Sequence, residues 1–149
     1  MMNDLFVISE GCLENIQEIY TLEKQIFKDE AWTLKMLQFE LSNSKISRTL
    51  IIQEGSFVLG YCMFRMYARE CQILNFGVLP QRQQEGIGSI LLTKILKNLT
   101  RNSSVFLEVK KSNFPAINLY KKHGFNIFGI RNNYYKDGAS ALLMQYQRK

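Results

Sequence analysis

The sequence predicts an α/β fold in which a mixed β-sheet of about six to seven strands is flanked by about four helices. Two amphipathic helical patterns come first, followed by a run of antiparallel strand signals. A strand, a glycine loop, a helix and a further strand follow, and a hairpin closes the chain. With 149 residues, 46% of them hydrophobic, and no internal repeat or low-complexity linker, the chain has the size of one domain spanning 1–149.

The first part of the chain predicts a strand and two amphipathic helices. A short apolar run over 5–9 is typical of a strand, and residues 12–27 carry apolar side chains at helical spacing. The members of this stripe are Leu13, Ile16, Tyr20, Ile26 and Phe27. Thr33 is a suitable N-cap for the second helix. The apolar positions of that helix are Leu34, Leu37 and Leu41.

Three antiparallel strands are expected next, over residues 48–54, 57–67 and 71–78. Gly55 and Ser56 fit the turn between the first two. In the third strand, Asn75 and Gly77 interrupt the apolar run, and a glycine at such a position often marks a bulge or the close approach of a ligand.

The segment 75–88, NFGVLPQRQQEGIG, leads from this strand into a helix over 89–99. Gly86 and Gly88 allow backbone N–H groups to approach an anion, and the first turn of a helix favours phosphate. The same glycine pair also fits a simple tight turn. Because neither G-x-G-x-x-G nor G-x-x-x-x-G-K-[ST] is present, we do not expect a dinucleotide or nucleoside triphosphate site.

A strand over 105–109 follows, and the crossover helix makes it parallel to the strand that precedes the glycine loop. Its residues are apolar except Glu108, which predicts a carboxylate in the middle of a buried strand. Ser112 or Asn113 caps the next helix, which runs to His123. A cation is stabilising near a helix C-terminus, so we interpret this histidine as structural. A hairpin over 125–135 and 139–146 closes the fold.

The composition argues against several classes of protein. Cys12, Cys62 and Cys71 lack C-x-x-C spacing, so we expect neither a disulfide framework nor a metal site and interpret all three as reduced core residues. No apolar run could span a bilayer and no secretory signal is visible, which favours a cytoplasmic protein. The net charge of +6 is spread along the chain. It suits an anionic cofactor and docking near a ribosome, but no direct nucleic-acid binding is predicted.

Three segments together resemble one enzyme family. QQEGIG (83–88) is similar to the Q/R-x-x-G-x-G/A acyl-coenzyme A signature of the GNAT N-acetyltransferase superfamily. LEVKKSNFPAINLYKKHGF (107–125) and IRNNYY (130–135) resemble the ribosomal-protein-alanine, or RimI-type, members. The resemblance implies a GNAT fold, acetyl-CoA as cosubstrate and transfer to a protein N-terminal α-amine, with a ribosomal protein as one candidate partner.

The resemblance also implies a set of cofactor-binding residues. They are Phe76, Gly77 and Val78 for the pantetheine arm, Gln84, Glu85, Gly86, Ile87, Gly88 and Ser89 for the pyrophosphate, and Asn113. Asn113 has the alternative of merely capping its helix. Glu85 departs from the family pattern, since an anion beside a diphosphate weakens binding unless its charge is directed away or compensated by Arg82.

Direct attack of an amine on an acetyl thioester requires a base, a stabilised oxyanion and a proton for the leaving thiolate. Glu108 is the expected base, because loss of hydration would make it more basic and because it occupies the position of the RimI-type proton acceptor. The alternative is a structural ion pair with a lysine. Tyr120 is the expected acid. It shares a helix face with Ala116 and Ile117 and lies in the family's L-Y-x-x-x-G-F context, although a core-edge tyrosine is the alternative.

The substrate-binding residues are expected to be Trp32, Arg131, Tyr134 and Tyr135. Trp32 has the alternative of closing the core between the two N-terminal helices, and the others could form a solvated strand. Ala139, Ser140 and Ala141 replace an acidic pair of the family, which makes a cationic peptide terminus a less certain acceptor. The alternative functions are acetylation of a small amine, a polyamine or a lysine side chain, or binding of acyl-CoA without turnover.

Overall fold

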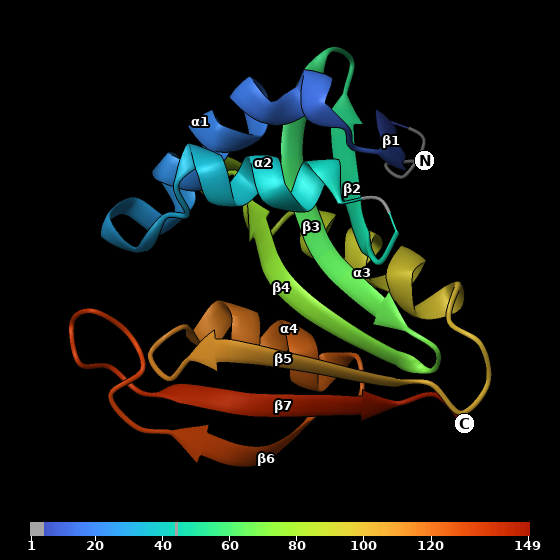
Figure 1. The fold of residues 1–149 in the computed structure, drawn as a ribbon, viewed down its shortest axis with the longest axis vertical. Helices are drawn as coiled ribbons and strands as arrows, with labels where there is room; N and C mark the ends of the chain where they lie inside the picture. Colours follow the sequence, from blue (N-terminus) through green and yellow to red (C-terminus); the bar gives the residue numbers. More distant parts are fainter. Residues whose placement is uncertain (1–4, 44) are drawn as a thin grey trace.

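The computed structural model describes residues 5–43 and 45–149, which form a seven-stranded sheet with helices on both faces (Figure 1). The strands are β1 (Phe6–Glu10), β2 (Ser47–Glu54), β3 (Phe57–Tyr67), β4 (Glu70–Val78), β5 (Ser104–Lys110), β6 (Asn126–Arg131) and β7 (Ala141–Gln147). The helices are α1 (Ile16–Phe27), α2 (Leu34–Ser42), α3 (Ile87–Lys97) and α4 (Phe114–Lys122), with 3-10 turns η2 (Leu13–Asn15), η3 (Lys28–Glu30) and η4 (Pro80–Arg82). The predicted fold class is therefore confirmed.

The strand order is β1-β2-β3-β4-β5-β7-β6. Strands β1 to β4 pair antiparallel in sequence order, as do β5 with β7 and β7 with β6. Strands β4 and β5 pair parallel, as the crossover through α3 predicts.

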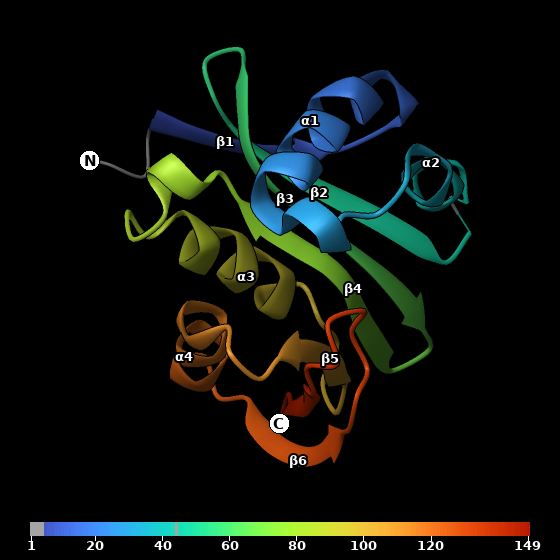
Figure 2. The ribbon, with the colours of Figure 1, turned by 90° about the vertical axis from the view of Figure 1, so that its left-hand side faces the viewer.

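Helices cover both faces of the sheet (Figure 2). On one face, Ile19 and Leu22 of α1 and Leu37 of α2 pack with Ile51 and Tyr61 of the sheet. On the other face, α3 and α4 pack over the sheet, and their buried side chains include Leu91, Leu92, Ile95, Ile117 and Tyr120. Each core follows from a helical apolar stripe placed on a sheet.

The parallel pair β4 and β5 separates soon after it begins. Only three residue pairs are in register, from Glu70 with Ser104 to Gln72 with Phe106. Beyond this point Leu74 is an extra residue in β4, because Met63 of β3 pairs with Asn75 while Phe64 pairs with Ile73. A bulge was one of the two alternatives for the glycine in this strand, and the bulge that the structure shows lies at Leu74, three residues before Gly77. Figure 1 shows the two strands diverging from their shared end.

Several details of the predicted elements are wrong. The first α-helix begins at Ile16, so Leu13 lies before it, and Leu13 is 45% exposed. The buried face of α1 also includes Glu23, which the predicted apolar stripe does not contain. Strand β6 ends at Arg131, which leaves Tyr134 and Tyr135 in the β6–β7 loop. Of the three cysteines, Cys62 and Cys71 are buried but Cys12 is exposed.

No helix within residues 5–43 and 45–149 is long and apolar enough to cross a bilayer. The prediction that the N-terminus carries no secretory signal concerns residues 1–4 in part, and these lie outside the described residues.

Candidate active site

A cavity of about 760 Å³ occupies the gap between the diverging strands β4 and β5. Its walls come from six parts of the chain: β4, Gln83 of the glycine loop, β5, α4 with its N-cap, the end of α1 with its connection to α2, and the β6–β7 loop. Glu108, Tyr120 and Asn113 all line it, as do Trp32, Phe76 and Tyr135. The other predicted site residues, Gly77, Val78, residues 84–89, Arg131 and Tyr134, do not line it.

Glu108 reaches this cavity from β5, but not from a fully buried position. Val105, Leu107 and Val109 are buried, whereas the Glu108 side chain on the alternate face is 23% exposed. The prediction of a deeply buried carboxylate is therefore wrong. Its partner is not a lysine either, since Arg131 Nη1 lies 3.2 Å from Glu108 Oε1.

Arg131 and Tyr134 hold the carboxylate of Glu108 from the side of β6. The Arg131 guanidinium lies 5.2 Å from the centre of the Tyr134 ring. A hydrogen bond to Glu108 raises the pKa of Tyr134 above its ordinary value. In this arrangement Arg131 contacts the candidate base directly.

Tyr120 presents a hydroxyl group to the cavity from α4. The residue is 5% exposed, and its ring packs against Phe76 at 6.1 Å and Phe125 at 5.5 Å between centroids. Burial raises its pKa well above the ordinary value, so the hydroxyl stays protonated at neutral pH. Among the hydrogen bonds of the described residues, none involves this hydroxyl, and it lies in the cavity wall, available to an incoming group.

The glycine loop forms a tight turn at the start of α3. Gln84 and Gly86 both have positive φ, 70° and 83°, and Gly86 is the N-cap of the helix but has no side chain with which to cap it. The first helical hydrogen bond runs from Ile90 N–H to Gly86 C=O. The N–H groups of Ile87, Gly88 and Ser89 therefore precede the helical ladder and are free to bind an anion.

The negative charge of Glu85 is balanced by Arg82 within the same loop. Arg82 Nε donates to Glu85 Oε2 at 2.7 Å, and the guanidinium also pairs with Glu54. Hydrogen bonds from Arg82 lower the pKa of Glu54. Arg82 thus compensates the charge of Glu85, as expected, but it shares its positive charge with the carboxylate of Glu54.

The end of β4 offers backbone groups to the gap. The Leu79 N–H donates to Leu59 C=O of β3, so by strand alternation Gly77 also turns its backbone toward β3, while Phe76 and Val78 turn theirs toward the gap. The Val78 carbonyl accepts a bond from the Gln83 side chain at 3.1 Å. Gly77 matters for packing instead, because a Cβ there would lie 2.7 Å from Ile26 Cδ1.

Asn113 caps α4 and also lies in the cavity wall, while its contact with the cofactor stays a prediction. Its Oδ1 accepts a hydrogen bond from Ala116 N–H at 3.3 Å, which makes it the N-cap of α4. The same residue lines the cavity.

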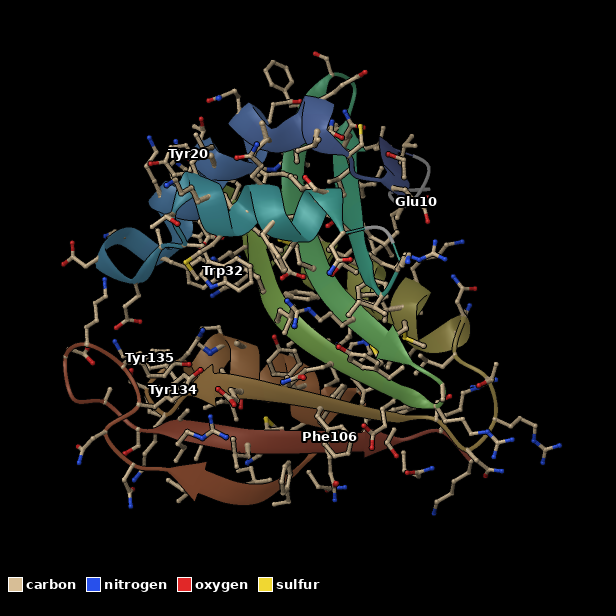
Figure 3. All side chains as sticks on the ribbon, in the orientation of Figure 1. Glu10, Tyr20, Trp32, Phe106, Tyr134 and Tyr135 are labelled. Carbon is tan, nitrogen blue, oxygen red and sulfur yellow. The ribbon has the colours of Figure 1, made fainter. Side chains whose placement is uncertain are left out.

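The opposite end of the cavity is bounded by aromatic side chains. Figure 3 shows Trp32 on one side of the opening and Tyr134 and Tyr135 on the other. Trp32 packs on the core beneath α1 and α2, as its structural interpretation predicts. It also lines the cavity, and its role as a substrate-side wall stays a prediction. The two tyrosines pack edge to face at 5.1 Å.

The sequence-based reasoning missed an ion-pair bridge across this opening. Lys110 Nζ lies 2.7 Å from Glu30 Oε1 in η3 and 2.6 Å from Asp137 Oδ2 in the β6–β7 loop. The ammonium also lies 5.6 Å from the centre of the Tyr135 ring. No local pattern marks these residues, because the two carboxylates are far from Lys110 in sequence.

Glu23 of α1 was also missed, although the sequence carries a signal for it. It continues the helical stripe formed by Ile16, Ile19 and Ile26, and a carboxylate in such a stripe indicates a buried polar site. The residue is 1% exposed and lines the cavity.

The remaining reactive side chains lie elsewhere. His123 caps the C-terminus of α4, with Nδ1 3.0 Å from Leu119 C=O and Nε2 3.0 Å from Ser89 Oγ, which agrees with a structural role. Burial raises the pKa of Cys71 to about 12 and that of Cys62 well above its ordinary value. Within the described part of the chain, no cluster of three His, Cys, Asp or Glu side chains could hold a metal ion.

Residues 13–125 match the acetyltransferase (GNAT) family. The chain is 33% identical over 135 residues to the N-alpha-acetyltransferase RimI of Mycobacterium tuberculosis, covering 87% of this chain and 84% of that protein. Its fold is similar to the ribosomal-protein-S18-alanine N-acetyltransferase of Escherichia coli, with a TM-score of 0.85, 24% identity and coverage of 95% and 93%. Arabidopsis thaliana NAA60, solved in complex with acetyl-CoA, has a TM-score of 0.82 at 16% identity, with coverage of 95% and 98%.

Proposed function

The chain belongs to the GNAT acetyltransferase family and is an N-acetyltransferase, and on that premise we propose that it transfers the acetyl group of acetyl-CoA to the α-amine of a protein N-terminus. A ribosomal protein is one candidate acceptor, since the Escherichia coli neighbour carries that activity in its name. One observation carries the proposal: Glu108 and Tyr120 line the same cavity, between the backbone of β4 and an aromatic opening.

Acetyl-CoA fits the groups that surround this cavity. The pyrophosphate binds at the N–H groups of Ile87 to Ser89, where the helix dipole of α3 favours an anion. The pantetheine arm follows β4 and pairs with the backbone of Phe76 and Val78, which faces the gap. Asn113 adds a polar contact. This path brings the thioester to the cavity between Glu108 and Tyr120.

The reaction is a direct transfer. The neutral amine attacks the thioester carbonyl carbon, and the new C–N bond forms as the C–S bond breaks. Glu108 takes a proton from the amine nitrogen, either directly or through a water molecule. The Tyr120 hydroxyl bonds the departing sulfur and supplies its proton, which solvent later replaces. No cysteine takes part, in agreement with the raised pKa of both buried thiols.

An α-amine suits the single partly exposed carboxylate. Its pKa of ~7.7 to 8.0 leaves a substantial neutral fraction at physiological pH, whereas a lysine near ~10.4 is almost wholly charged. A weak base therefore serves the first acceptor and not the second. Trp32 and Tyr135 form the walls that orient the first residues of the acceptor, and Tyr134 packs against Tyr135.

The decisive experiment measures release of free CoA from acetyl-CoA. One acceptor is a peptide with a free N-terminal alanine, and the matched control is the same peptide N-terminally blocked and containing a lysine. Release is expected only with the free terminus. The Glu108→Gln variant, which keeps the size of the side chain, is expected to lower kcat by about 100-fold or more.

Two other results would redirect the assignment. Turnover of the blocked, lysine-containing peptide or of a polyamine, with none for the free terminus, means that the enzyme acts on a different amine. Binding of acetyl-CoA without release for any acceptor would refute catalysis. We also propose that residues 1–149 form one such domain, because β4 and β5, from the two halves of the chain, both supply walls of the cavity.

A further inference from the structure

One buried carboxylate has no part in the reaction proposed above. Glu23, in the third turn of α1, is 1% exposed, and burial raises its pKa above the ordinary value. A carboxylate in such a place is costly unless hydrogen bonds replace its lost hydration. Glu23 has three such bonds, all from groups outside α1.

The three donors come from three different parts of the fold. Glu23 Oε1 accepts from the Tyr61 hydroxyl of β3 and from Asn75 Nδ2 of β4, the latter at 2.6 Å. Glu23 Oε2 accepts from the backbone N–H of Trp32 at 2.9 Å. The two oxygen atoms thus face different neighbours: one is bound to the sheet and the other to the connection before α2.

Two of these donors belong to different walls of the cavity. Asn75 directly follows the bulge residue Leu74 and precedes Phe76, whose backbone faces the gap where the pantetheine arm would lie. Trp32 lies on the acceptor side of the opening. Tyr61, by contrast, is a fully buried core residue that is absent from the cavity lining.

We propose that Glu23 is a positioning residue that fixes the Trp32 wall to the bulge of β4 and so sets where the acceptor lies relative to the acyl group. The link itself depends only on the three hydrogen bonds, and its effect on turnover rests on the proposed acetyl transfer. A carboxylate is needed because all three neighbours are donors. A methionine at the same place keeps the length of the side chain but has no oxygen atom to accept the three hydrogen bonds.

Glu23→Met therefore removes the whole link, and Tyr61→Phe, which removes only the bond from β3, is its control. Both variants lose hydrogen bonds at the same buried site, so both are expected to melt at a lower temperature than the parent protein. Only Glu23→Met releases the Trp32 wall. A general loss of packing would affect the Trp32 wall in both variants.

Trp32 provides a readout that needs no turnover, because it is the only tryptophan in the chain. Acrylamide quenching of its fluorescence, measured without substrates well below the melting temperature, is expected to be about twofold stronger in Glu23→Met than in the parent. In Tyr61→Phe it is expected to match the parent. Equal quenching in all three proteins would overturn the proposed link, whatever reaction the protein performs.

Kinetics then test the consequence for catalysis. With the free-terminus peptide, Glu23→Met is expected to lower kcat/KM for the acceptor by about 10- to 100-fold while leaving the KM for acetyl-CoA unchanged. Tyr61→Phe is expected to leave both constants close to those of the parent. If the two variants lose activity by the same factor, Glu23 is a structural residue only. If the parent itself acetylates no peptide, the proposed function fails while the quenching result still decides the link.

Discussion

Tyr61 and Tyr120 are two buried tyrosines with opposite expectations for the same substitution. The Tyr61 hydroxyl donates to the Glu23 carboxylate, whereas the Tyr120 hydroxyl has no bond among the described residues and lies in the cavity wall. Replacing either residue by phenylalanine removes one oxygen atom and leaves the ring. The pair therefore separates a hydroxyl that stabilises the fold from one that is available for chemistry.

The magnitudes follow from these contacts. A hydrogen bond to a charged group contributes about 2 kcal/mol, so Tyr61→Phe is expected to lower the melting temperature by roughly 6 °C in a protein of this size. Tyr120→Phe keeps the contacts with Phe76 and Phe125, so its stability is expected to change by no more than about 0.5 kcal/mol. Its kcat is expected to fall about 100-fold, because the leaving thiolate loses its proton donor.

Thermal melts and the CoA-release assay, applied to both variants, check this prediction. A loss of stability in Tyr120→Phe as large as that in Tyr61→Phe would mean that the hydroxyl has a structural partner. Undiminished kcat in Tyr120→Phe would refute its role as the acid. Burial raises the Tyr120 pKa, so the parent should keep its activity on the alkaline side up to at least the ordinary tyrosine range.

Three further predictions concern other parts of the site. Lys110→Met removes the bridge between Glu30 and Asp137. Kinetics are expected to show a several-fold higher KM for the acceptor, and melts a loss of stability below about 1 kcal/mol. An unchanged KM would contradict a role for the bridge. Gly86→Ala is expected to lower the free energy of unfolding by about 1 kcal/mol, because φ is +83°, although an added Cβ would meet nothing within 4 Å. Calorimetry is expected to show weaker binding of acetyl-CoA to this variant. Because the Glu23 pKa is raised, the parent should gain stability relative to Glu23→Gln in urea melts as pH falls from neutral toward 4.5, and a pH-independent difference would count against this.

Much of the fold could be predicted because its signals are local. The helical stripes, the Gly55 turn, the Thr33 cap and the glycine loop each depend on residues within a few positions of one another. The parallel pairing of β4 and β5 followed from the helix between them. Tyr120 could be placed on the buried face of α4 from its spacing with Ala116 and Ile117 alone.

The candidate site was predictable in its members more than in its environment. Glu108 lies in the expected strand, but alternation along β5 turns it to the partly exposed face, and its partner is Arg131. Tyr134 and Tyr135 lie in a loop because β6 ends at Arg131, where pairing with β7 stops. Local propensity could not reveal either fact, since both depend on the register between strands.

The sequence by itself determined the order and type of the elements, the glycine loop before α3 and the identity of two candidate catalytic residues. Only the tertiary structure decided which carboxylates are paired and which walls are connected. Glu23 is 38 residues from Tyr61 and 52 from Asn75, and Lys110 is 80 residues from Glu30. Such contacts form where the packing of α1 against β4 and the divergence of β4 from β5 bring distant groups together. The periodicity within one segment cannot predict contacts between residues that lie so far apart in the sequence.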